Sequence, residues 1–319
     1  MRNRPRATLS PQSSVLSPEL DVVTGAFGYT GRHIARRLLS AGKRVKTLTG
    51  HPLRQNEFGD AVTVAPLGFD DPDELTRSLQ GATTLYNTYW IRFPHGQMTF
   101  ERAVQNSKTL IKAAEDAGVR RIVHISITNP SPDSPFPYFK GKAIVEKAIT
   151  SSKLSYAILR PAVIYGDEGI LINNIAWFLR RLPVFAVPGS GDYQLRPIFV
   201  DDLAELAATL AAAEGNTITD AVGPETYTFN DLLRVIAASV QVRARLVHVH
   251  PQLALLVSGL VGYVIGDVVL TRDEVRGLIA NLLASDQPPT GQTRLSDWLA
   301  QNADWLGTRY ISELKKRYR

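Results

Sequence analysis

Residues 22–35 read V-V-T-G-A-F-G-Y-T-G-R-H-I-A, and this stretch decides the fold class. Two β-branched residues lead into Gly25, Gly28 and Gly31, and a run with helical spacing follows. In such a strand–loop–helix unit the glycines allow a tight turn, a close backbone approach to a pyrophosphate, and close packing of helix on strand. The helix N-terminus offers free N–H groups to the anion. We therefore predict a dinucleotide-binding loop, with a purely structural turn as the alternative.

Apolar strand-like runs alternate with helix-like runs through the first half of the chain. This alternation predicts an α/β fold, a doubly wound parallel Rossmann sheet with helices on both faces. After about Tyr165 the pattern changes to helices with short strands, which predicts a smaller, mainly helical C-terminal substrate or lid region. Ligands of such sheets bind beyond the carboxyl ends of the strands, so the residues after each strand are the candidates.

The expected organisation has four parts. They are a disordered basic tail over 1–19, an NAD(P)-binding Rossmann core over 20–165, a substrate or lid region over 166–287 interleaved with the last core strands, and a basic helical tail over 288–319. The first tail is rich in Arg, Ser and Pro and has no acid before Glu19. It lacks the apolar segment of a secretory signal, and an organelle transit peptide is the alternative.

Composition excludes several kinds of chemistry. The chain of 319 residues contains no cysteine, so disulfides and thiolate catalysis are excluded, and its six histidines show no metal-ligand spacing. The net charge of +6 owes much to basic residues near both ends. We interpret them as solvated tails, with an anchor for anionic lipid as the alternative, and predict no nucleic-acid binding.

One uncharged apolar stretch, residues 253–266, has to be examined as a possible membrane-spanning segment. It is shorter than the roughly 18–20 residues that span a bilayer. We expect a buried helix or a lid over a substrate pocket, with shallow insertion into a membrane surface as the alternative. The expected location is therefore cytoplasmic or peripheral to a membrane, and the oligomeric state is left open.

The end of the second strand indicates which dinucleotide fits. Enzymes that bind NAD usually place an acid there to hold the ribose 2′-hydroxyl. Residues 47–54 contain no acid, whereas His51 and Arg54 are basic. A 2′-phosphate would be accommodated, so we favour NADP(H) over NAD(H) as cofactor. Arg54 as an ordinary surface charge is the alternative.

Tyr138 and Lys142 are four residues apart and so share one face of a predicted helix. A nearby ammonium lowers the pKa of a phenol and can also hold the ribose hydroxyls next to the nicotinamide. The phenol can then give or take a proton at a carbonyl or alcohol near neutral pH. We predict that this pair is catalytic and acts on a small-molecule substrate.

Four motifs resemble those of the extended and atypical short-chain dehydrogenase/reductases, and they occur in that family's order. They are T-G-A-F-G-Y-T-G, Y-F-K-G-K followed by Glu146, R-P-A-V-I-Y-G over 160–166, and R-P-I-F-V-D-D-L-A over 196–204. The resemblance covers roughly residues 20–240. It is nearest to the atypical branch, with the NmrA-like proteins and the dehydrogenase-like accessory subunit of respiratory complex I.

The resemblance implies roles for individual residues. Asn106 would support the catalytic centre, and Arg196 would grip a substrate phosphate, with packing against Asp201 or Asp202 as the alternative. The implied cofactor-binding residues are Gly25, Phe27, Gly28, Tyr29 and Gly31 in the phosphate loop, Phe69 at the adenine, Asn87 and Thr88 after the fourth strand, Lys142, and Pro161 and Val163 beside the nicotinamide.

The chain departs from the family at the catalytic hydroxyl. After the fifth strand the family has a serine pair, and Ser126 matches its first member. Ile127 stands in the place of the catalytic serine, so Thr128 would have to supply the hydroxyl. An oxyanion donor is commonly worth about 10²–10³ in rate, so this loss counts against ordinary carbonyl reduction.

Three functions therefore remain open. The first is an NADP-dependent oxidoreductase of an apolar carbonyl, alcohol or enone. In this function Tyr89 and Trp90 form an aromatic wall for the substrate, with ordinary core aromatics as the alternative. The second is a non-catalytic NADPH-binding protein with a structural or regulatory role in a membrane complex. The third is a sugar-nucleotide epimerase or dehydratase, which Arg196 favours and Ile127 disfavours.

Overall fold

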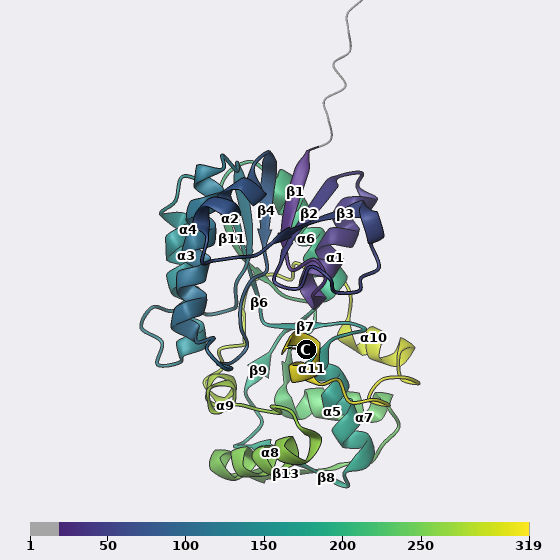
Figure 1. Ribbon diagram of the computed structural model, residues 1–319. Coiled ribbons are helices and arrows are strands. Elements are labelled where there is room, and N and C mark those ends of the chain that lie inside the picture. The colour runs from purple at the N-terminus through teal and green to yellow at the C-terminus, as the bar shows by residue number, and fades with distance from the viewer. Residues whose placement is uncertain (1–18, 319) are drawn as a thin grey trace, which may run out of the picture.

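The computed structural model describes residues 19–318, so nearly all of the predicted tail over 1–19 lies outside the described residues. Its main layer is a seven-stranded parallel sheet of order β11-β6-β5-β4-β1-β2-β3, seen in the upper half of Figure 1. In chain order the strands are β1 (Leu20–Thr24), β2 (Arg44–Thr49), β3 (Val62–Pro66), β4 (Ala82–Asn87), β5 (Arg121–Ile125), β6 (Ser155–Pro161) and β11 (Thr217–Ala221). This confirms the predicted doubly wound Rossmann sheet.

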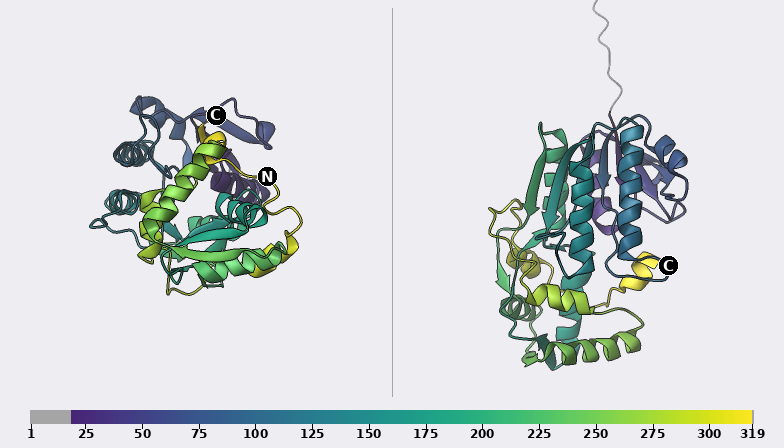
Figure 2. Two further views of the ribbon diagram at one scale, coloured as in Figure 1. Left: turned by 90° about the horizontal axis from the view of Figure 1, so that it is seen from below. Right: turned by 90° about the vertical axis from the view of Figure 1, so that its left-hand side faces the viewer.

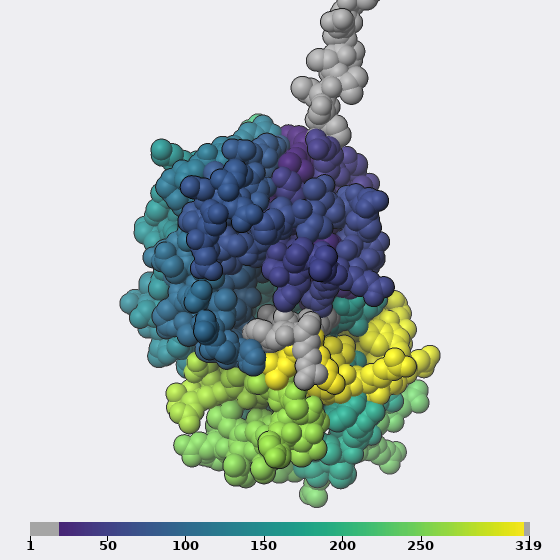
Figure 3. Space-filling model, in the orientation of Figure 1, coloured from purple at the N-terminus to yellow at the C-terminus, as the bar shows by residue number. Residues whose placement is uncertain are grey.

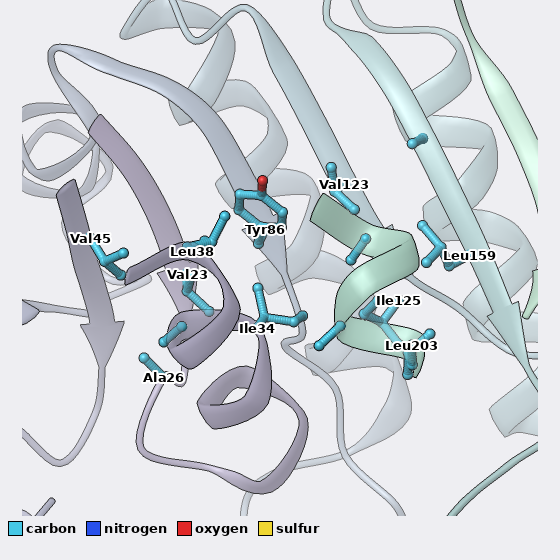
Figure 4. Packing of buried hydrophobic residues seen from close by; sticks show 14 of the residues in the cluster. Val23, Ala26, Ile34, Leu38, Val45, Tyr86, Val123, Ile125, Leu159 and Leu203 are labelled. Atoms are coloured by element: carbon cyan, nitrogen blue, oxygen red, sulfur yellow. The ribbon is translucent and has the colours of Figure 1, made fainter. Parts of the chain in front are cut away.

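Helices cover both faces of the sheet because successive strand residues point to opposite sides. Val23, Tyr86 and Val123 pack under α1 (Tyr29–Ser40) and α6 (Val200–Ala212) (Figure 4). Their chain neighbours, such as Val22 and Leu85, pack under the helices of the other face. Those helices are α2 (Pro72–Leu79), α3 (Phe100–Asp116) and α4 (Pro137–Thr150).

The remaining elements form a second layer beyond the carboxyl ends of the sheet strands (Figures 1 and 2). Its strands pair as β7 (Val163–Tyr165) with β10 (Pro197–Phe199), β8 (Val184–Pro188) with β13 (Arg245–Val249), and β9 (Gln194–Leu195) with β12 (Tyr227–Thr228). Its helices are α5 (Ile170–Arg181), α7 (Phe229–Ser239), α8 (Pro251–Ile265), α9 (Arg272–Ile279), α10 (Leu295–Gln301) and α11 (Glu313–Tyr318), and a 3-10 turn, η1 (Gly59–Ala61), precedes β3. The predicted mainly helical C-terminal region is thus confirmed.

Helix α8 contains most of the uncharged stretch over 253–266, and the expectation that it is buried is wrong. Only Ala254 and Gly262 of this helix are buried. Propensity and hydropathy predicted the helix correctly, but they do not tell which side of it the rest of the protein covers. Within residues 19–318 no helix combines the length and the apolarity that crossing a bilayer requires.

Candidate functional site

The glycine loop after β1 has the geometry of a phosphate cradle. Gly25 has a φ of +67°, which favours glycine, and its N–H donates to the carbonyl of Leu48 at 2.8 Å. A Cβ at Gly31 would lie 2.8 Å from the carbonyl carbon of Gly25 and closer still to its oxygen. Helix α1 can therefore approach β1 this closely only with glycine at position 31.

The N-terminus of α1 is open to an anion. Its N-cap is Gly28, which has no side chain to accept a hydrogen bond, and no acid stands in the first turn of this helix. The N–H groups there and the positive end of the helix dipole are thus available to a pyrophosphate. The residues of this loop fit the diphosphate of a dinucleotide.

The two aromatic residues of the loop have different surroundings. Phe27 is buried and stacks on Phe58, with 6.5 Å between ring centroids, so its side chain belongs to the core. The hydroxyl of Tyr29 points at the turn after β7, where a Cβ at Gly166 would lie 2.9 Å from it. Burial raises the pKa of Tyr29, so this phenol stays neutral.

The carboxyl ends of β1 and β4 are tied together. Thr88 donates through its hydroxyl to the carbonyl of Thr24 at 2.6 Å, and its N–H donates to the hydroxyl of Thr24 at 2.8 Å. Asn87 is fully buried, and its amide lies 3.1 Å from Nδ1 of His124. The backbone at this edge is therefore fixed, while the side chain of Asn87 faces the interior of the fold.

The loop after β2 brings the predicted basic residues to the surface. His51 is exposed, Arg54 is half-buried, and the N–H of Arg54 closes a turn on the carbonyl of His51 at 3.1 Å. Glu57, farther along this loop, accepts a hydrogen bond of 2.6 Å from Arg36 of α1. This ion pair, which holds the pKa of Glu57 below its ordinary value, is not evident from the sequence.

Lys142 of the predicted catalytic pair is almost completely buried. Its ammonium donates to the carbonyl of Ile125, at the end of β5, with 2.7 Å between the heavy atoms. Burial lowers the pKa of Lys142 to about 7, and the Glu146 carboxylate opposes this shift. The protein thus holds a lysine that is only partly charged near neutral pH.

Trp90 contacts both members of the pair. Its indole lies 4.8 Å from the ammonium of Lys142, measured to the ring centroid, and meets the ring of Tyr138 edge to face at 6.0 Å. A Cβ at Gly141 would lie 2.8 Å from this indole. Gly141, which the sequence analysis did not single out, therefore leaves the room in α4 that Trp90 fills.

Tyr89 and Phe69 form a second aromatic contact near the same edge, with 4.8 Å between ring centroids. The amide of Asn106 donates to the hydroxyl of Tyr89 at 2.8 Å. Asn106 thus reaches the site through Tyr89, and the loop after β4 brings both predicted wall residues to the α3–α4 side of the sheet.

The segment after β5 offers no obvious replacement for the catalytic serine. Ile127 is buried, and Thr128 donates its hydroxyl to the carbonyl of Leu282 at 2.9 Å. Two buried polar atoms, Oγ of Ser126 and Nε2 of His124, have no hydrogen-bond partner among the described residues. Burial lowers the pKa of His124, so the ring is neutral. A bound ligand or water at this edge would satisfy such atoms.

Pro161 and Val163 lie beside this segment, at the end of β6 and the start of β7. The carbonyl of Pro161 accepts a hydrogen bond of 3.1 Å from the N–H of Thr128, and Val163 is buried. The segment after β5 is therefore joined to the end of β6 by a backbone hydrogen bond. Among the described residues no group of metal-binding side chains is assembled.

Arg196 is buried and donates to backbone carbonyls, at 2.8 Å to Gly223 and 2.5 Å to Gln287. Neither acid named as its packing partner accepts these bonds. Asp201 lies 2.5 Å from His33 of α1, and Asp202 accepts from the backbone near Thr293. The guanidinium of Arg196, which lies between β9 and β10, thus joins this part of the chain to the segments at Gly223 and Gln287.

The C-terminal segment lies near the phosphate loop, which the sequence did not reveal. Glu168 pairs with Arg32 of α1 and also borders a cavity of about 660 Å³. The other residues that line the cavity are Ile265, Arg309, Tyr310, Ile311, Ser312 and Lys315. In Figure 3 the yellow C-terminal residues lie directly below the purple N-terminal part of the sheet domain.

Asp267 anchors this segment. It accepts hydrogen bonds from the hydroxyl of Tyr310 at 2.8 Å and from the backbone N–H groups of Glu313 and Leu314 at 2.9 and 3.1 Å. Arg92, which follows the aromatic wall, lies 3.5 Å from Glu313. The C-terminal helix is thus joined to the loop after β4.

Comparisons with known proteins agree with this geometry. Residues 25–174 match the model of an NAD(P)H-binding family. Subunit 9 of the NADH dehydrogenase [ubiquinone] 1 alpha subcomplex from Arabidopsis thaliana is 23% identical over 296 residues, which cover 86% of this chain and 73% of that protein. Ceramide reductase from Caulobacter vibrioides is 28% identical over 244 residues, which cover 74% of this chain and 75% of the reductase.

Among solved structures, the NADPH-dependent quinone oxidoreductase QOR2 from Escherichia coli, complexed with NADPH, superposes with a TM-score of 0.72. The match covers 88% of this chain and 99% of that one at 19% sequence identity. At this identity the likeness shows the fold, which is the Rossmann arrangement described above.

Proposed function

Because the chain belongs to the atypical short-chain dehydrogenase/reductase family and has its NAD(P)-binding domain, we propose that it is an NADPH-dependent oxidoreductase of an apolar carbonyl, alcohol or enone. The proposal depends mainly on one observation, the contact of Trp90 with both Tyr138 and Lys142. Phe100 and Ile91 continue this apolar surface. An acid–base pair bordered by an indole and a phenyl ring favours a substrate whose reacting group is attached to an apolar body.

The residues divide the chemistry between them. Bound nicotinamide would supply the hydride to the carbonyl carbon, or accept it from the alcohol carbon. The hydroxyl of Tyr138 gives the matching proton to the substrate oxygen, and in the reverse direction the phenolate of Tyr138 takes the proton from the alcohol. Lys142 would hold the ribose hydroxyls and orient the cofactor, while its hydrogen bond to the carbonyl of Ile125 fixes its own position.

Two further features support the cofactor and the substrate class. His51 and Arg54 follow the end of β2, and the guanidinium of Arg54 presents positive charge where a 2′-phosphate would lie. One relative is named for the reduction of ceramide, which is a lipid. We infer that this chain prefers NADPH and a substrate of low polarity.

The test uses the purified full-length protein and lipophilic aldehydes, ketones and quinones. We expect NADPH oxidation that depends on the carbonyl, and a loss of about 10²–10⁴-fold in kcat in Tyr138→Phe with NADPH affinity retained. Tyr263→Phe, on the exposed helix α8, is the matched control and keeps full activity. Equal activity of Tyr138→Phe and the unmodified protein would overturn the assignment.

A second function is favoured by a different observation. Ile127 has no hydroxyl, and the hydroxyl of Thr128 is engaged by the carbonyl of Leu282. A chain that lacks the catalytic hydroxyl at position 127 could hold NADPH for a structural or regulatory role in a membrane complex, and one relative is named as a subunit of NADH dehydrogenase. The sugar-nucleotide function has no such support, because Arg196 is occupied by backbone carbonyls.

Ile127→Ser separates the two functions. In a working oxidoreductase the added hydroxyl raises kcat, by up to about 10²-fold if it reaches the substrate oxygen. A non-catalytic holder would instead be isolated with bound NADPH that no carbonyl oxidises, in the unmodified protein and in Ile127→Ser alike. That second result would establish the alternative.

A further inference from the structure

Helix α8 presents a continuous apolar stripe to the outside of the molecule. Leu253, Leu256, Val257, Leu260 and Val264 are all exposed and recur at the spacing of one helix face. The largest exposed fractions among these side chains are 62% for Leu260 and 82% for Val264. Exposed side chains of this size scattered singly are ordinary, but a full-length stripe marks an interaction surface.

The chemistry of the stripe is uniform. Residues 251–266 contain no charged residue, and Tyr263, at the edge of the stripe, is 90% exposed. A nearly free tyrosine with an apolar ring and a polar hydroxyl is the residue type that membrane–water interfaces favour. The stripe therefore lacks the charges that specify a polar protein partner.

Exposed cations flank the helix on both sides in the chain. Arg243 and Arg245 precede it, in and next to β13, and Arg272 and Arg276 follow it in α9, which packs against α8. Of the three acids between residues 243 and 276, Asp267 is buried, Glu274 pairs with Arg92 at 2.5 Å, and Asp273, next to Arg272, is half-buried. Positive charge thus dominates the surroundings of the stripe.

The position of α8 lets a flat surface reach it. The helix runs along the end of the molecule farthest from the amino ends of the sheet strands, and it lies across the long axis (Figures 1 and 2). Residues of this part of the chain form the lower end in the space-filling view (Figure 3). A planar partner can therefore contact the whole helix while the sheet domain points away.

We propose that α8 binds an anionic lipid surface, with its stripe in the boundary between headgroups and acyl chains and the flanking arginines at the lipid phosphates. A helix that lies in this boundary needs an apolar face and nearby positive charge, and it does not need to span the bilayer. A second copy of the chain fits less well. In a two-fold symmetric dimer the same patch of each copy faces the other, so the arginines of both copies would lie close together and repel each other.

The experiment is co-sedimentation of the full-length protein with vesicles of phosphatidylcholine and phosphatidylserine in a ratio of about seven to three. We expect binding that weakens at high salt and on pure phosphatidylcholine. Leu256→Glu/Leu260→Glu lowers the partition coefficient by at least about tenfold. Ile218→Glu, on the exposed face of β11, is the control for added charge and binds as the unmodified protein does.

Three outcomes would overturn the proposal. The first is no binding to either kind of vesicle. The second is equal binding of Leu256→Glu/Leu260→Glu and the unmodified protein, which would assign the attraction to other basic segments. The third is a dimer in solution that the double variant dissociates, which would assign the stripe to a second copy. Circular dichroism of the variants confirms that they are folded, and the assay requires neither cofactor nor substrate.

Discussion

The ammonium of Lys142 lies 4.8 Å from the centroid of the Trp90 indole and donates its hydrogen bond to the carbonyl of Ile125 at 2.7 Å. The indole therefore covers the ammonium group that we propose as the ribose anchor of the cofactor. Burial of Lys142 disfavours its charged form. This effect makes the stability of the folded protein depend on pH.

Lys142 makes stability depend on pH in a defined window. Burial lowers its pKa to about 7 in the native state, against about 10.4 in an unfolded chain. Between these values the unfolded chain binds more protons, so the free energy of unfolding rises with pH, by up to about 1.4 kcal/mol per pH unit for this one group. Urea unfolding from about pH 7.5 to 9.5 should show this contribution in the unmodified protein and lose it in Lys142→Met. The exposed Lys140 provides the control, since Lys140→Met keeps the slope. Equal slopes in all three proteins would show that Lys142 titrates normally.

Gly31→Ala should weaken cofactor binding. The new methyl group overlaps the carbonyl of Gly25, so α1 must move away from β1 and carry its N–H groups out of position. We expect the NADPH dissociation constant to rise at least about tenfold and the free energy of unfolding to fall by about 1–3 kcal/mol. Calorimetric titration and urea unfolding measure the two effects. Gly259→Ala, in α8, meets nothing within 4 Å and should leave NADPH affinity unchanged. Full NADPH affinity in Gly31→Ala would show that the glycine loop does not bind the diphosphate of the cofactor.

Arg54→Gln tests the choice between the two dinucleotides. If the guanidinium pairs with the 2′-phosphate, its loss weakens NADPH binding by about 10–100-fold, because a charge-assisted hydrogen bond is worth about 1.5–3 kcal/mol. NADH affinity should not change. Arg77→Gln, an exposed arginine of α2, serves as the control. A parallel loss of NADH and NADPH affinity would mean that Arg54 supports the loop rather than the phosphate.

Asp267→Ala should release the C-terminal helix. The substitution removes three hydrogen bonds to Tyr310, Glu313 and Leu314. We expect the free energy of unfolding to fall by about 2 kcal/mol or more. Amide hydrogen exchange should become at least about tenfold faster in residues 311–315 and stay unchanged in β1. The exposed Asp297 pairs only loosely with Arg294, at 3.8 Å, so Asp297→Ala should change stability by less than about 0.5 kcal/mol. Unchanged exchange in Asp267→Ala would show that other contacts hold the segment.

The sequence predicted those features whose cause is local. The glycines at positions 25 and 31 are required by one turn and one helix, and the close contact between them lies within a stretch of 14 residues. The order of strands and helices follows from their apolar periodicity. The sharing of one helix by Tyr138 and Lys142 follows from their spacing in the same way.

Other features of the site depend on residues far apart in the chain. Thr128 bonds to the carbonyl of Leu282, 154 positions away, so its spacing from the fifth strand could not show that its hydroxyl is engaged. The room for Trp90 in α4 exists because Gly141 faces the loop after β4. The buried and partnerless Nε2 of His124 likewise reflects the packing of several elements, and no motif marks it.

By itself the sequence determined the Rossmann sheet, its phosphate loop and the uncharged helix α8. Turns, apolar periodicity and hydropathy depend on residues that are close together in the chain. Only the tertiary structure decided that Trp90 covers Lys142, that the chain near Tyr310 lies close to the phosphate loop, and that α8 faces outward. Burial and contact between distant segments depend on how whole elements pack, and an apolar side chain has the same hydropathy whether the fold covers it or leaves it exposed.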